Sequence, residues 1–196
     1  MKRIAFCAML VALLALVSMN ASAQGQMSVG AGVDIMLPVG NFGNAWSTGF
    51  GGTGEFDYAF SEQGTCITGK IGYLTWSGKS LPSGISASYG GVPLLVGVKY
   101  YPHLFASQAG SPVRVYGHLE LGLMFGSTSY SGTYTGFGYA GFGYSGSQSK
   151  TDFTIVPSVG MEIPAGPKGA VDLSIRYFDI ASNGSIGLRG GYKLNL

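Results

Sequence analysis

The chain has 196 residues, with 11 basic and 9 acidic side chains; 46% of its residues are hydrophobic and only 10% are charged. Lys2 and Arg3 fall in the leader discussed next, so the rest of the chain has no net formal charge, and no basic excess points to a nucleic-acid partner. Cys66 is the only cysteine beyond the leader, which excludes an intrachain disulfide.

The first 23 residues have the pattern of an export leader. Lys2 and Arg3 precede an apolar run over residues 4–17, and small residues follow at Ala21 and Ala23. This order of charged, apolar and small residues is typical of a signal peptide. The apolar run is shorter than the roughly 20 residues that a membrane-spanning helix needs. We expect cleavage after Ala23 and a single domain over residues 24–196.

Eight segments after the leader alternate apolar and polar side chains with a period of two, which is typical of strands that have one apolar face. The segment 113–125 is the clearest, because Leu119 and Leu123 lie on one face and His118 and Glu120 on the other. In chain order, the segments cover residues 28–37, 50–60, 67–73, 94–101, 113–125, 152–163, 171–177 and 186–196.

The connections between these segments differ in length. Residues 61–64 and 165–168 are short and rich in turn-forming residues. They alternate with longer connections at residues 38–47, 77–90 and 127–150. Two others, 103–112 and 181–184, do not follow this alternation. The pattern predicts an antiparallel meander with short turns at one end and long loops at the other.

Alternation alone leaves open which face is the core, because a water-soluble barrel would bury the apolar face. Two features favour an apolar face that contacts lipid. That face is almost free of charge over about ten residues per segment, the length of a tilted membrane-spanning strand, and aromatic residues gather near its ends. The other face mixes small residues with balanced charges, which suits a confined interior where charges must be paired.

The last segment resembles the closing strand of bacterial outer-membrane β-barrels, since Tyr192, Leu194 and Leu196 alternate with Lys193 and Asn195. Together with the leader and the eight segments, it makes residues 24–196 similar to the eight-stranded OmpA- and OmpX-like barrels. The resemblance implies an all-β, antiparallel up-and-down transmembrane barrel in the outer membrane of a Gram-negative type bacterium. It also implies contact with outer-membrane lipid and recognition of the last strand by the barrel-assembly machinery.

The polar face predicts a charged network inside the barrel. If residues 61–64 close a simple hairpin, Glu55 lies opposite Lys70 inside the barrel and Tyr58 lies opposite Ile67 outside it. The predicted members of the network are Glu55, Asp57, Lys70, Lys99, Arg114, His118, Glu120, Glu162, Asp172, Arg176, Arg189 and Lys193.

Two further features concern the wall of the barrel. Many inward positions are glycine, which either makes room for long Arg and Lys side chains or leaves a narrow wet cavity; the sequence leaves both open. Pro157 has no N–H to donate in a closed sheet, so a bulge or a weakened ladder is expected there.

No constellation in the sequence points to catalysis. His103 lies in a connection, and His118 sits in mid-strand beside Glu120 on the inward face, away from lipid. No cluster of Cys, His and Asp has the spacing of metal ligands. We therefore predict no catalytic residue, no metal site and no cofactor. A lipid A-modifying enzyme, with His118 as its only candidate base, remains an alternative.

The long connection 127–150 is the candidate region for surface contacts. It interleaves Tyr and Phe with Gly, as binding loops do, although a hairpin that extends two strands beyond the membrane or a mobile loop would carry the same composition. The sequence favours a non-enzymatic outer-membrane protein with a structural or surface-interaction role, and a narrow porin-like channel is the alternative. The predicted contacts to an extracellular ligand are Trp46, Tyr130, Tyr134, Phe137, Tyr139, Phe142 and Tyr144.

Overall fold

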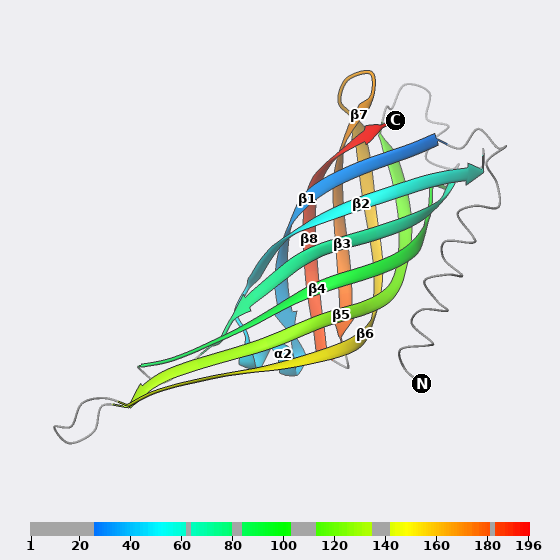
Figure 1. Ribbon diagram of the computed structural model, residues 1–196. Coiled ribbons are helices and arrows are strands. Elements are labelled where there is room, and N and C mark those ends of the chain that lie inside the picture. The colour runs from blue at the N-terminus through cyan, green and yellow to red at the C-terminus, as the bar shows by residue number, and fades with distance from the viewer. Residues whose placement is uncertain (1–25, 62–63, 80–83, 103–112, 135–141, 181–182) are drawn as a thin grey trace.

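The computed structural model describes residues 26–61, 64–79, 84–102, 113–134, 142–180 and 183–196. Within them, one antiparallel sheet closes on itself, because its last strand pairs with its first (Figure 1). Each strand pairs with its neighbours in chain order, which confirms the predicted up-and-down barrel. The strands are β1 (Gln26–Val39), β2 (Gly49–Ser61), β3 (Thr65–Ser77), β4 (Ile85–Tyr100), β5 (Arg114–Tyr134), β6 (Phe142–Pro164), β7 (Gly169–Ile180) and β8 (Asn183–Asn195).

The predicted register of the first short hairpin is confirmed. Glu55 pairs with Lys70 and Tyr58 with Ile67 across β2 and β3. An irregularity between Ala59 and Ser61 shifts the ladder only beyond these pairs, next to the turn. A one-residue slip would turn every side chain of a strand to the other face, so this register decides which residues enter the lumen.

The apolar face of the sheet points outward. Val33 is 68% exposed and Val159 is 62% exposed, whereas the charged side chains of Lys99 and Glu120 are completely buried. The predicted aromatic residues near the strand ends, such as Phe50 and Tyr192, are also exposed on the outer face. This distribution is the reverse of a water-soluble core and matches a barrel wall that faces hydrocarbon.

The ladder weakens at two prolines, as expected for Pro157. Between β6 and β7 the pairing stops after Ile155 and resumes at Ser158 with the register unchanged. A similar gap separates β3 from β4 opposite Pro93. Each proline keeps its pairing on the other side, so the missing N–H costs hydrogen bonds on one side only and needs no bulge.

The long connections contain regular structure, including the hairpin extension that the sequence left open for residues 127–150. A short helix, α2 (Gly40–Ala45), interrupts residues 38–47, and Gly40 enters it with a φ of 60°, which favours glycine. Within the described residues, no helix is long and apolar enough to cross a membrane. Residues 85–90 belong to β4, and β5 and β6 stay paired as far as Tyr134 and Phe142. These extensions consist largely of serine, with tyrosine and threonine as the residues of high β-propensity, and they lack the apolar alternation that marks a half-buried strand.

The extended parts of β4, β5 and β6 form a sheet that reaches beyond the barrel, and we call residues 85–89, 127–134 and 142–150 the projection. Figure 1 shows it at the same end of the barrel as α2, opposite the end that holds the C-terminus and the start of β1. β6 gains its first β7 partner only at Thr154, so its edge over residues 142–153 has no partner strand among the described residues.

Candidate functional site

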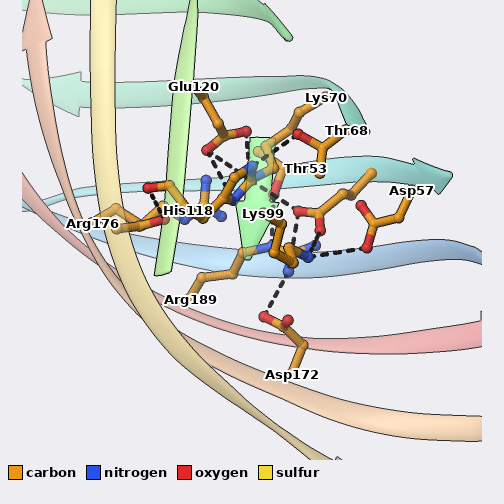
Figure 2. Close-up of polar contacts among 12 residues, drawn as sticks. Thr53, Asp57, Thr68, Lys70, Lys99, His118, Glu120, Asp172, Arg176 and Arg189 are labelled. Atoms are coloured by element: carbon orange, nitrogen blue, oxygen red, sulfur yellow. Dashed lines mark hydrogen bonds and ion pairs between the residues drawn. The ribbon is translucent and has the colours of Figure 1, made fainter. Parts of the chain in front are cut away.

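A buried ionic network lies inside the barrel (Figure 2). Lys99 lies at its centre, with Nζ 2.5 Å from Glu55 Oε1 and 3.0 Å from Asp57 Oδ2. Lys70 Nζ lies 2.9 Å from Glu55 Oε2 and 2.8 Å from Glu120 Oε1. Lys99 is on β4 and Asp57 on β2, so this network also connects strands that do not pair in the sheet.

The same kind of contact crosses the seam where the barrel closes. Lys193 on β8 forms ion pairs with Asp57 on β2 and with Glu162 on β6, the latter at 2.5 Å. Tyr101 donates a hydrogen bond to Glu162 at 2.7 Å. These contacts join β2, β6 and β8, and they tie the last strand to both sides of the barrel.

Two arginines complete the network. Arg189 lies 3.0 Å from Asp172, which also accepts a hydrogen bond from the Tyr116 hydroxyl at 2.9 Å. Arg176 lies 2.8 Å from Asp34. Within the described residues, six buried acids face five buried lysines and arginines. A buried charge is tolerated only when it is paired, and this near balance meets that requirement.

The inward glycines make room for these long side chains. A Cβ on Gly32 would lie 2.8 Å from Arg189 Nε, and one on Gly30 would lie 2.8 Å from Lys193 Cγ. A larger residue at either position would displace the cation from its carboxylate. Of the two alternatives left open by the sequence, the structure supports filling by arginine and lysine at these positions.

The structure buries eleven of the twelve residues predicted for this network inside the barrel, and Arg114 is the exception. Arg114 is exposed, and its guanidinium lies 4.2 Å from the centre of the Tyr101 ring at the end of the lumen. It is the first residue of β5, too near the barrel end to be buried. Asp34 and the hydroxyls of Tyr101 and Tyr116 are additional members, and the inward position of Asp34 in the alternating pattern is the signal that could have included it.

His118 is part of this polar interior. Its Nε2 lies 2.8 Å from the Thr68 hydroxyl, and its Nδ1 lies 3.8 Å from Glu120. The residue is 6% exposed. The other histidine, His103, lies outside the described residues. No group of three or more metal-ligating side chains forms in the part of the chain that the structure describes.

An apolar layer fills the lumen at the end that carries α2, and alternation did not reveal it, because the inward face there is apolar as well. Phe42 of α2 packs against the Trp76 ring at 5.6 Å and against the Tyr89 ring at 5.8 Å. The buried members of this layer are Met36, Phe42, Leu74, Trp76, Leu95, Met124, Val156 and Phe178.

Trp46 lies beside this layer at the barrel mouth, and its role as an external contact stays a prediction. The ring is half-buried and lies 5.8 Å from the Tyr89 ring and 6.2 Å from the Phe42 ring. Trp46 follows α2 directly, and the hydrogen bond from its N–H to Phe42 O turns the chain back over the barrel mouth. Packing of a large apolar ring against its neighbours is favoured over exposure.

The projection carries the other predicted contacts. Tyr130 and Tyr144 are 47% and 49% exposed, and each ring lies across the glycine with which it pairs, Gly146 and Gly132 respectively. A Cβ on Gly132 would lie 2.6 Å from Tyr144 Cζ. Phe137 and Tyr139 lie outside the described residues, and for Tyr134 and Phe142 only the backbone pairing is described.

The opposite face of the projection is a lattice of serines. Ser86, Ser131 and Ser145 pair in one row across the three strands, and Ser88, Ser129 and Ser147 in the next. The hydroxyls of Ser86 and Ser131 lie 2.8 Å apart. The two faces of the projection therefore differ chemically, with aromatic rings on one and hydroxyls on the other.

Solved structures of other barrels resemble this fold. The attachment invasion locus protein Ail of Yersinia pestis, in complex with the heparin analogue sucrose octasulfate, matches at 16% identity and a TM-score of 0.54, covering 88% of this chain and 97% of that one. OprG of Pseudomonas aeruginosa matches at 13% identity and a TM-score of 0.55, covering 89% of this chain and 96% of that one. A major outer membrane protein of Thermus thermophilus matches at 16% identity and a TM-score of 0.57, covering 88% of this chain and 99% of that one.

At these identities the solved structures show the shared fold, a closed barrel that outer-membrane proteins use. No curated protein sequence matches the chain. The family model described as the outer membrane protein beta-barrel domain matches residues 8–195, which is nearly the whole sequence. With the outward apolar wall and the ionic lumen, this match places the chain in the outer membrane protein β-barrel family.

Proposed function

We propose that this outer-membrane barrel is a non-catalytic surface protein that makes its contacts through the tyrosine face of the projection. The observation that carries the proposal is the paired extension of β5 and β6, as far as Tyr134 opposite Phe142, beyond the apolar band of the barrel. The projection thereby holds its side chains in fixed positions outside the membrane, which favours binding because little loop entropy is lost.

The tyrosine face is suited to contact with a partner. Tyr130 and Tyr144 each cover a glycine with one side of the ring, so the other side faces outward. An aromatic ring held in this way offers a large contact area at a low cost in conformational entropy. The proposal uses the predicted contact role of these two residues, and the role stays a prediction for Trp46, Tyr134, Phe137, Tyr139 and Phe142.

The two alternatives draw less support from the interior. The apolar layer around Trp76 and the ionic network around Lys99 fill successive levels of the lumen, and we infer that no solute path runs through it. For a lipid A-modifying enzyme, His118 would have to reach a lipid substrate. It is buried between Thr68 and Glu120 inside the barrel, so we infer that it has a structural role.

The Ail complex contains a polysulfated sugar, which is strongly anionic. In the projection, Lys150 pairs with Asp152 at 2.5 Å, and the other described side chains there are uncharged. A sulfated ligand is bound through several cations. We therefore propose a partner with little net charge rather than a sulfated one.

Assembly and export follow the same reasoning. We propose that the assembly machinery recognises β8 together with Leu196, which follows it and is 73% exposed. A Leu196→Asp change should then lower the amount of folded barrel in the outer membrane. Unchanged amounts would contradict this.

We also propose cleavage after Ala23, in residues outside the described part. N-terminal sequencing of the purified protein tests this, and any first residue other than Gln24 would contradict it.

The central test uses three purified proteins as bait for molecules released from the surfaces of neighbouring cells. They are the natural chain, the Tyr130→Ala/Tyr144→Ala variant and the Tyr130→Phe/Tyr144→Phe variant. We expect the alanine variant to lose the captured partner and the phenylalanine variant to keep it, because the ring makes the contact. Equal capture by all three, with all three folded, would refute the proposal.

A further inference from the structure

The outer face of the strands changes character where the barrel meets the projection. Along β5, the outward residues Leu121, Leu123 and Phe125 are followed by Ser127, Ser129 and Ser131. The apolar part covers about ten residues, enough for a tilted strand to cross the hydrocarbon layer. A serine hydroxyl without a partner is unfavourable in hydrocarbon, so the first serine marks the level of the lipid headgroups.

The same change occurs on the two neighbouring strands, so it is a property of the whole surface. On β4, the outward residues pass from Leu94 and Val92 through Gly90 to Ser88 and Ser86. On β6, Phe153 is followed toward the tip by Thr151 and then by further serines. The cross-strand pairs place these serines side by side, which gives a continuous hydroxyl surface directly above the lipid-facing wall.

An open hollow of about 980 Å³ lies against this surface. More than half of its lining residues are serines, and Tyr130 and Gly146 also border it; the serines are Ser77, Ser86, Ser88, Ser129, Ser131, Ser145 and Ser147. All residues that line it within the described chain are uncharged. A site for the phosphates of a lipid would carry arginine or lysine, so the chemistry of this hollow favours neutral groups with many hydroxyls.

We propose that this serine face binds the neutral sugars in the headgroups of outer-leaflet glycolipids. The position of the hollow indicates this partner. The hollow continues the lipid-facing wall at headgroup level, and sugars occupy that level in a glycolipid leaflet. Serine hydroxyls donate and accept hydrogen bonds with sugar hydroxyls. This inference goes beyond the proposed function, since it concerns the opposite face of the projection and the membrane itself.

The consequence is an anchored projection. With its serine face on the sugar layer, the tyrosine face is held at a fixed orientation above the membrane. Each hydroxyl contact is weak, but an array across three strands provides several at once, and affinity depends on their sum.

The test measures access to single cysteines in nanodiscs. In a Cys66→Ser background, Ser129→Cys probes the hollow, and Gln148→Cys on the tyrosine face is the matched control; both native residues are exposed. Three discs are compared: phosphatidylethanolamine alone, the same lipid with lipopolysaccharide that carries neutral hexoses, and the same lipid with lipopolysaccharide truncated before the hexoses. Maleimide labelling of residue 129 is expected to slow about tenfold only with the hexose-bearing lipid, as for a site about nine-tenths occupied.

Labelling at residue 148 is expected to stay the same in all three discs. Equal labelling of residue 129 in all discs, or equal slowing by the truncated lipid, would overturn the proposal. A Ser86→Ala/Ser88→Ala/Ser129→Ala/Ser131→Ala protein provides a second measurement. Its retention of the hexose-bearing lipid in detergent is expected to fall at least about tenfold. Capture of surface partners through Tyr130 is measured separately, so the two proposals can fail independently.

Discussion

The barrel and the projection are built from the same strands and share one continuous register, yet their two faces carry opposite chemistry. In the barrel part of β5, the outward residues Leu119 and Leu123 are apolar, and the inward Glu120 is charged and buried. In the projection part, the outward Ser129 and Ser131 are polar, and Tyr130 lies on the face that continues the lumen side. Strand pairing therefore continues unchanged from the barrel into the projection, whereas the side chains on each face suit the lipid, the lumen or the headgroup layer that they contact.

The largest effect is expected from the centre of the lumen. A Lys99→Met change removes the cation shared by Glu55 and Asp57 and leaves two buried carboxylates with fewer cationic partners. The free energy of unfolding should fall by about 3–5 kcal/mol. Urea unfolding in detergent micelles measures it.

Lys150→Met is the matched control for that change, because the Lys150 side chain is 67% exposed at the base of the projection, where it pairs with Asp152. It should alter stability by less than about 0.5 kcal/mol. A similar loss of stability in both variants would contradict the distinction between buried charges in the barrel and an exposed lysine in the projection.

A substitution in the apolar layer should lower the free energy of unfolding almost as much as one in the ionic network. Trp76 is 1% exposed and packs at 5.4 Å from the Tyr89 ring, so Trp76→Ala should cost about 3–5 kcal/mol through the cavity it leaves. Replacing the exposed Tyr144 should cost far less. Comparable losses in thermal unfolding experiments would contradict the division between a packed lumen and an open projection.

Conductance tests the filled lumen directly. We expect no discrete openings in planar bilayers for the natural protein, because the layer around Trp76 and the network around Lys99 lie in series. The Trp76→Ala variant should also stay silent, since the ionic network remains. Reproducible single-channel steps in the natural protein would instead favour the porin-like alternative.

The smallest expected effect concerns the tyrosine face. Tyr144→Ala uncovers Gly132 and removes a cross-strand contact of about 0.2–1 kcal/mol. Amide exchange at Ser131 and Ser145, which pair beside it, should become a few-fold faster, whereas exchange at Leu121 in the barrel should not change. Tyr144→Phe is the control, because it keeps the ring over the glycine. Unchanged exchange after Tyr144→Ala would show that the projection is held by its backbone alone.

Much of the barrel was predictable because period-two alternation is a local property. Each of the eight segments carries its own apolar face, and the short turn at residues 61–64 was enough to predict Glu55 opposite Lys70. The packing of Trp46 beside the apolar layer was not predictable, for a physical reason. An aromatic residue in a connection carries no local sign of whether it faces water or packs over the barrel mouth.

Apart from Glu55 and Lys70, the lumen contacts were predictable as a set and not as pairs. Lys99 on β4 forms an ion pair with Asp57 on β2, and Lys193 on β8 forms one with Glu162 on β6. The partners therefore belong to strands that do not pair in the sheet. Hairpin register relates only neighbouring strands. Barrel closure decides which second neighbours meet, and that depends on the curvature of the whole sheet.

The sequence by itself determined the number of strands, their up-and-down order and the face that contacts lipid, because these depend on side-chain alternation within each strand. Only the tertiary structure decided the apolar layer beneath α2, the partners of each buried charge and the length of the projection. Those features arise where segments distant in the chain come together. At Ser129 and Tyr130, the hydroxyl and aromatic faces became visible only when β4, β5 and β6 lay side by side.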